Sequence, residues 1–208
     1  MNIQENINEI YDQYSIPPNL RQHMQRVAAF AAKIATNWQG AEPIDKALII
    51  DACLLHDLGN IIKFDFDNFP ELLGAEQARI EYWREVKTNM IAKYGNDEDA
   101  ATCEMIKEIG VSPEVAFIVE NWGFKNFTRI EESDNWNWKI AVYSDHRISP
   151  SGVVTLKQNL ENKQKRYRIS RHNSSLLSKG ADGLFKSAER IEQELGKRLM
   201  LDIHKVVI

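Results

Sequence analysis

Residues 47–60, ALIIDACLLHDLGN, combine a long apolar run with a polar end. The apolar residues predict a strongly buried helix over about 44–58, which stops near Gly59. His56 and Asp57 follow two leucines at the end of that helix. A carboxylate in such an apolar setting is costly unless it is paired or bound to a metal ion. The stretch therefore predicts a polar site at the end of a core helix.

Two more helices carry a polar residue of metal-ligand type in an apolar setting. His23 lies on an apolar stripe of a helix that opens with Pro17 and Pro18, and Asp145 follows the apolar run 140–143. Taken alone, each has an ordinary reading as a hydrogen-bonded core histidine or a helix-end aspartate. Together with the first pair they make two imidazoles and two carboxylates, which need compensating partners when buried. This mixed nitrogen and oxygen set suits manganese, iron, cobalt, nickel or magnesium.

The rest of the chain also has helical patterns. We expect helices over about 75–94, 97–109, 113–121, 136–148, 154–168 and 181–200, with an ordered loop or short turns at 64–74. Evidence for strands is thin and is confined to short runs such as 206–208, which could pair only at an edge. The sequence thus predicts an all-α protein that forms a single helical bundle domain over 1–208.

Composition excludes several classes of protein. The chain has 208 residues, of which 43% are apolar and only 10 are Gly, with 26 Lys+Arg against 30 Asp+Glu, so it is neither disordered nor collagen-like. No apolar run approaches the ~18 residues of a membrane helix, and no signal peptide is visible. Cys53 and Cys103 are read as buried thiols of a reducing compartment, so we expect a cytoplasmic protein. The slight negative charge gives no general reason to expect a nucleic-acid partner.

The polar residues and their surroundings resemble the HD-domain superfamily of metal-dependent phosphohydrolases. His56 lies 33 residues after His23, and Asp145 lies 88 residues after Asp57, and this order and spacing are typical of that family. The segments HMQRVAAFAAKIA, ALIIDACLLHDLGN and IAVYSDHRISPSGVVTL are similar to its first helix, its His-Asp helix and its final-Asp helix. The resemblance covers about 17–168 and leaves 169–208 as a C-terminal helical extension.

The resemblance implies a helical bundle with a catalytic metal ion. The implied metal ligands are His23, His56, Asp57 and Asp145. A metal-activated water would attack a phosphomonoester or phosphodiester, and Asp57 would also orient or deprotonate that water. Because no histidine lies between Asp57 and Asp145, one divalent metal ion is expected, unless acids such as Asp97 or Glu98 complete a second site.

Phosphate recognition needs cations near the metal. We expect Lys63, Arg147 and Arg26 to bind the substrate, although each could equally be an ordinary surface charge. His146 is expected to be a catalytic proton donor to the leaving oxygen, with an outward-facing orientation as the alternative. The expected substrate is a nucleotide-like or other small phosphorylated molecule.

Several alternatives stay open. Asn60 stands where the nucleotidase and alarmone-hydrolase branches of the family usually carry Glu, so a non-catalytic metal- or ligand-sensing module is one alternative. A weaker one is an RNA phosphodiesterase that grips RNA through the basic run 163–172. The aromatic residues of 64–74 and of 122–127 could line a pocket or belong to the core, and the C-terminal helix could pack on the body or form a homodimer.

Overall fold

The computed structural model describes residues 2–169 and 181–208, without the side chains of 163–169 and 181–182. Within these residues nearly all regular structure is helical, which confirms the all-α prediction. Two strands of two residues each form a small antiparallel hairpin. None of the described helices combines the length and the apolar character needed to cross a membrane.

The chain forms two compact units. The first comprises Met1–Gln25 and Asp51–Glu120, and the second comprises Arg26–Ile50 and Asn121–Ile208. Helices α2 (Pro18–Thr36) and α3 (Lys46–Leu55) supply residues to both. The single domain expected over 1–208 stays a prediction.

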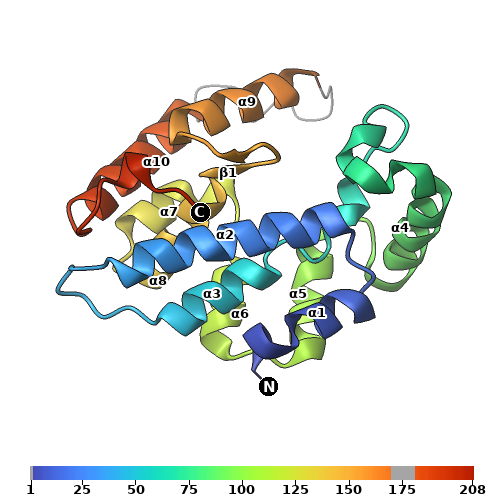
Figure 1. Ribbon diagram of the computed structural model, residues 1–208, viewed down its shortest axis with the longest axis horizontal. Helices are drawn as coiled ribbons and strands as arrows, with labels where there is room; N and C mark the ends of the chain where they lie inside the picture. Colours follow the sequence, from blue (N-terminus) through green and yellow to red (C-terminus); the bar gives the residue numbers. More distant parts are fainter. Residues whose placement is uncertain (1, 170–180) are drawn as a thin grey trace. The chain divides into compact units, whose positions relative to one another are not determined.

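The first unit is built from short helices. Its elements are α1 (Ile3–Gln13), η1 (Asn60–Lys63), η2 (Pro70–Arg79), α4 (Ile80–Tyr94), α5 (Glu98–Ile109) and α6 (Pro113–Glu120), most of them labelled in Figure 1. Helix α5 packs against α4, α6 and η1, and α4 also packs against η1 and η2. Asp97 caps α5 by accepting a hydrogen bond from the Ala100 amide, and Gly110 ends the helix with a φ of 74°.

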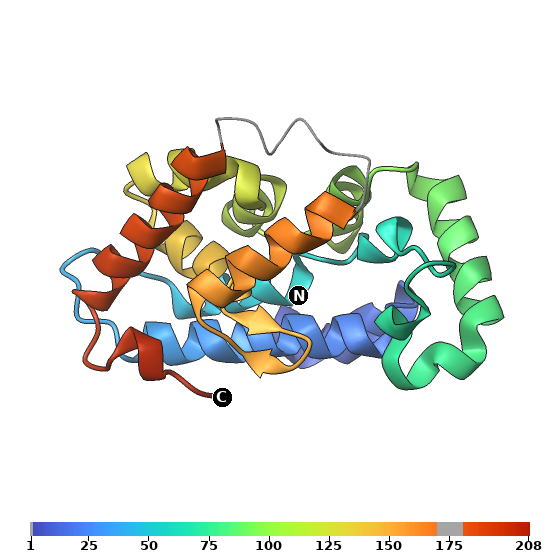
Figure 2. The ribbon, with the colours of Figure 1, turned by 90° about the horizontal axis from the view of Figure 1, so that it is seen from above.

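The second unit is organised around α10 (Ala181–Gly196). This helix packs against α7 (Phe127–Glu132), α8 (Trp136–Asp145), α9 (Leu156–Ile169), η3 (Phe124–Asn126) and η4 (Ile203–Lys205), and it is drawn in red in Figure 2. The hairpin pairs β1 (Ile148–Ser149) with β2 (Gly152–Val153), and Gly152 has a φ of 118°. A turn of this kind favours glycine because other residues rarely adopt a positive φ.

Several elements differ from the sequence-based expectation. Helix α1 was not expected, although Ile3, Ile7 and Ile10 form its buried stripe. Helix α7 was not expected either, because six residues give too little periodicity. The helix expected over 136–148 ends at Asp145, where the hairpin takes over, and 206–208 forms no strand.

The segment before α4 also departs from expectation. The helix expected over 75–94 begins as α4 only at Ile80, because the preceding residues form the irregular η2. Gly74 interrupts η2 with φ 56° and ψ −126°, a conformation that breaks a regular helix.

Candidate metal centre

His56 and Asp57 directly follow Leu55, the last residue of α3. The last carbonyl groups of a helix have no partner within the helix. Here the Cys53 carbonyl accepts a hydrogen bond from His56 Nδ1 at 2.8 Å, and the Leu54 carbonyl accepts one from the Tyr11 hydroxyl at 2.7 Å. At the end of the helix, side chains therefore replace backbone amides as hydrogen-bond donors to these two carbonyl groups.

The hydrogen bond to Cys53 decides which nitrogen of His56 can bind a metal ion. A carbonyl oxygen only accepts, so Nδ1 carries the ring proton. In the neutral ring the lone pair is then on Nε2, the state in which histidine ligates metals. This Nε2 lies 3.6 Å from Asp57 Oδ2, in a side chain that is only 1% exposed.

His23 reaches the same carboxylate from α2. Its Nε2 lies 3.7 Å from Asp57 Oδ2. The rings of His23 and His56 meet edge to face with centroids 5.4 Å apart, and their ligand nitrogens lie within 4.8 Å of each other. The side chains of His23 and Asp57 are 24% and 20% exposed, so solvent reaches this corner.

These three groups fit a divalent cation. Bonds of about 2.0–2.2 Å from nitrogen and oxygen to a metal such as zinc place neighbouring ligands roughly 3–3.6 Å apart, close to the 3.7 and 3.6 Å that separate Asp57 Oδ2 from the two histidine nitrogens. The carboxylate supplies negative charge and the imidazoles supply lone pairs. The first unit thus brings together His23, His56 and Asp57. Asp145, the last residue of α8, belongs to the second unit, and its part in the site stays a prediction.

The backbone just after Asp57 is held by α5. The Gly59 amide donates to Thr102 Oγ1 at 2.9 Å, and this hydroxyl donates to the Glu98 carbonyl at 2.8 Å. A Cβ atom on Gly59 would lie 2.5 Å from the Glu98 carbonyl oxygen, so only glycine fits at this contact. Lys63 Nζ lies 3.8 Å from Glu98 Oε1 in a half-exposed pair.

The contacts of Tyr11 and Thr102 with this segment carry no signal in the sequence. Tyr11 is fully buried and Thr102 is 4% exposed. Tyr11 follows the isoleucine stripe of α1, which marks it as buried but does not reveal the Leu54 carbonyl as its partner. A threonine in the middle of a helix carries no signal of its own.

His146 lies in the core of the second unit. It is 1% exposed, and its Nδ1 donates to the Val142 carbonyl at 3.0 Å. Its ring packs against Phe127 and Phe124, with centroids 4.7 and 6.0 Å away. These contacts favour a role in packing, while proton donation by His146 stays a prediction.

Arg147 is also buried in the second unit, with 1% of its surface exposed. Its guanidinium donates to the carbonyl oxygens of Val154 at 2.7 Å and Ile203 at 2.9 Å. It also donates to the Tyr143 hydroxyl and lies 3.6 Å from the Glu192 carboxylate. These partners give Arg147 a structural role, and its contact with phosphate stays a prediction.

Arg26 donates to the Pro150 carbonyl at 3.2 Å, also within the second unit. Its contact with substrate stays a prediction, as does that of Lys63. The side chains of the basic run 163–172 lie outside the described residues. Among the aromatic residues, Phe64, Phe66 and Phe127 are buried in the core, whereas Phe69 is 39% exposed.

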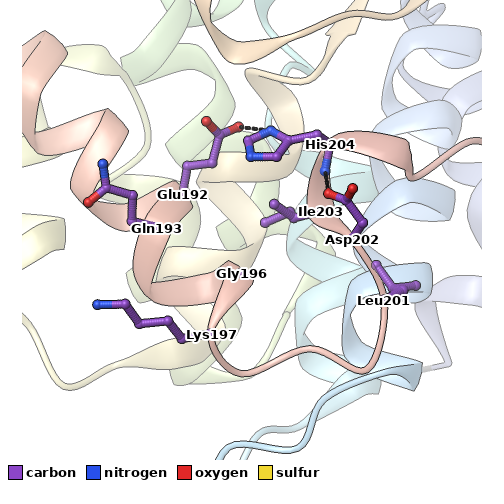
Figure 3. A pocket seen from close by; sticks show the side chains of 8 residues that line it. All are labelled: Glu192, Gln193, Gly196, Lys197, Leu201, Asp202, Ile203 and His204. Atoms are coloured by element: carbon purple, nitrogen blue, oxygen red, sulfur yellow. Dashed lines mark hydrogen bonds and ion pairs between the residues drawn. The ribbon is translucent and has the colours of Figure 1, made fainter.

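An open pocket of about 460 Å³ lies in the second unit, between the end of α10 and η4. Figure 3 shows the Glu192 carboxylate turned toward His204, whose Nδ1 lies 3.9 Å from it. None of the predicted site residues lines this pocket.

A comparison with protein families assigns the segment that contains His23, His56 and Asp57 to a family. The family model of the HD domain matches residues 20–121, a span that includes His23, His56 and Asp57. This chain contains an HD domain. The match confirms the resemblance to the HD-domain superfamily of metal-dependent phosphohydrolases. No curated protein and no solved structure matches the chain.

Proposed function

We propose that this HD domain protein is a metal-dependent phosphohydrolase that cleaves a phosphomonoester or phosphodiester of a nucleotide-like or other small phosphorylated molecule. One observation carries the proposal: Asp57 Oδ2 lies within 4 Å of Nε2 of both His23 and His56, and the hydrogen bond to Cys53 keeps the His56 lone pair on that nitrogen. The HD domain match supports the same class of chemistry.

The proposed ligands are His23, His56 and Asp57, with Asp145 as a fourth ligand carried over from the family resemblance. A divalent cation held there would lower the pKa of a water molecule and offset charge on the phosphoryl oxygens. Asp57 would accept a hydrogen bond from the attacking water and so orient it, since its side chain is 20% exposed. Lys63, with half of its side chain exposed, would attract the phosphate group.

The test is metal analysis of protein purified without chelator, joined to hydrolysis assays. We expect close to one Mn²⁺, Co²⁺ or Ni²⁺ per chain and turnover of at least one member of a panel of chromogenic phosphate esters and nucleotides. His56→Ala should lose both metal and turnover. His204→Ala is the matched control, because His204 is an exposed histidine of the second unit and should change neither. Full metal occupancy and full rate in His56→Ala would contradict the proposal.

A second candidate function is a metal- or ligand-sensing module without turnover. Asn60 favours it, since this neutral amide is 8% exposed and stands three residues after Asp57, where related enzymes usually carry an acid. The same experiment separates the two candidates. Tight metal binding without hydrolysis of any ester, under any of the three ions, would favour the sensor.

A further inference from the structure

We propose that Tyr11 and Thr102 are positioning residues of the metal centre. They belong to two other helices, and they hold the turn after α3 that carries His56 and Asp57. Tyr11 belongs to α1 and Thr102 to α5, both labelled in Figure 1. The inference rests on the proposed function for the use of this turn as a metal site. Both residues contact backbone groups of the turn, so they would act through His56 and Asp57 and touch no reacting atom.

Tyr11 holds the turn on the side that precedes His56. Its hydroxyl donates to the Leu54 carbonyl at 2.7 Å. In a continuing helix this carbonyl would accept from the Leu58 amide, but that amide donates to the Leu55 carbonyl at 3.4 Å. A tyrosine hydroxyl is protonated at neutral pH, and burial raises the pKa of Tyr11 further, so this hydroxyl can donate the hydrogen bond.

Thr102 holds the turn on the side that follows Asp57. Its buried hydroxyl accepts from the Gly59 amide and donates to the Glu98 carbonyl, so its proton has a fixed direction. The missing side chain of Gly59 lets the two backbones approach closely, because a Cβ there would meet the Glu98 carbonyl oxygen at 2.5 Å. The hydroxyl therefore links α5 to the turn at a point with no free space.

The two hydrogen bonds flank the ligand pair. One ends on Leu54, two residues before His56, and the other on Gly59, two residues after Asp57. Four residues of backbone between two anchors leave little freedom for the ring of His56 or the carboxylate of Asp57. Loss of groups that orient metal ligands typically costs 10–100-fold in metal affinity.

The test uses variants that remove one hydroxyl each. Tyr11→Phe and Thr102→Val should each raise the Kd for Mn²⁺, measured by titration calorimetry, by about 10–100-fold. Thr102→Ser keeps the hydroxyl and should bind Mn²⁺ like the wild type.

Two control variants remove the same kind of bond away from the turn. Tyr14→Phe deletes a tyrosine hydroxyl that donates to Glu108, and Thr88→Val deletes a threonine hydroxyl that donates to the Arg84 carbonyl one turn earlier in α4. Both should bind Mn²⁺ within about twofold of the wild type. If all four deletions lower stability but leave the Kd unchanged, Tyr11 and Thr102 have a general structural role and the inference is wrong.

A second measurement does not depend on metal or turnover. In chelator-treated protein the ¹⁵N signals of the His56 ring report which nitrogen is protonated, and the wild type should show Nδ1–H. Tyr11→Phe and Thr102→Val should shift these signals, while the control variants should not. If the wild type binds no Mn²⁺, the proposed function fails, yet the ring signals still decide on the positioning role. Unchanged His56 signals in both variants would overturn it.

Discussion

Gly59 is the residue at which the His56–Asp57 turn has least room. Its φ of −83° suits any residue, so space and not backbone strain excludes a side chain. The nearest atom to a Cβ would be the Glu98 carbonyl oxygen at 2.5 Å, and a backbone atom cannot rotate away. Steric crowding of this kind typically lowers the stability of the folded state by about 1–3 kcal/mol.

Gly59→Ala should therefore lower the free energy of unfolding by about 2 kcal/mol in urea titrations with chelator present. Gly183→Ala is the matched control in α10, where a Cβ would meet nothing within 4 Å. In the control variant the free energy of unfolding should rise by up to about 1 kcal/mol, because alanine loses less backbone entropy than glycine when a helix forms. Equal changes in the free energy of unfolding for the two substitutions would show that the Glu98 carbonyl oxygen does not exclude a side chain at position 59.

At the residue scale the sequence identified three polar residues that the first unit brings together, but it did not reveal their surroundings. His23, His56 and Asp57 stood out because polar groups in apolar stripes need partners. Arg147 was expected near phosphate because it follows Asp145 by two residues. Its burial against the Val154 and Ile203 carbonyl groups depends on segments that meet only in the folded chain, and spacing along the sequence does not contain that information.

At the scale of elements, Glu108 on α5 joins three helices of the first unit. Its Oε2 accepts from the Tyr94 hydroxyl at 2.8 Å at the end of α4 and from the Tyr14 hydroxyl at 3.1 Å just after α1. Lys93 Nζ lies 3.0 Å from its Oε1. The hydrogen bonds from Tyr94 and Lys93 lower the pKa of Glu108 below its ordinary value of 4.5. Folding thus favours the ionised carboxylate.

The lowered pKa of Glu108 predicts how the stability of the protein depends on pH. A carboxyl group whose pKa is lowered in the folded state stabilises the protein above its unfolded pKa, and this contribution is lost as the pH falls through the folded pKa. The stability difference between wild type and Glu108→Gln should be present at pH 7 and should shrink below about pH 4.5. Urea unfolding at several pH values measures it. Glu104→Gln, which removes only an ion pair with Lys107 inside α5, should show a much smaller change.

The helix expected over 97–109 agrees closely with α5, whose ends are well defined. Asp97 caps its first turn, and Gly110 ends it in the left-handed conformation. Helix α1 was missed although its isoleucine spacing is helical, and its importance lies in Tyr11, which meets α3 in the fold. The start of α4 was expected about five residues too early, because residues 75–79 are apolar and polar in a helical pattern but belong to the 3₁₀ helix η2.

At the scale of the whole molecule, metal binding and folding should be coupled. His23 is on α2 and Asp57 follows α3, so the cluster exists only when the first unit is folded. An ion that binds the folded chain but not the unfolded one stabilises it by RT ln(1 + [M]/Kd), which is ~2.7 kcal/mol at a hundredfold excess over Kd.

Mn²⁺ at a hundredfold excess over its Kd should therefore raise the free energy of unfolding of the wild type by ~2.7 kcal/mol, and chelator should reverse the gain. Asp57→Asn removes the charge with little change of shape and should abolish it. Asp12→Asn removes an exposed carboxylate that pairs with Arg21 and should retain it. If Asp57→Asn gains as much stability as the wild type, Asp57 is not a ligand of the stabilising ion, and the ion binds elsewhere on the protein.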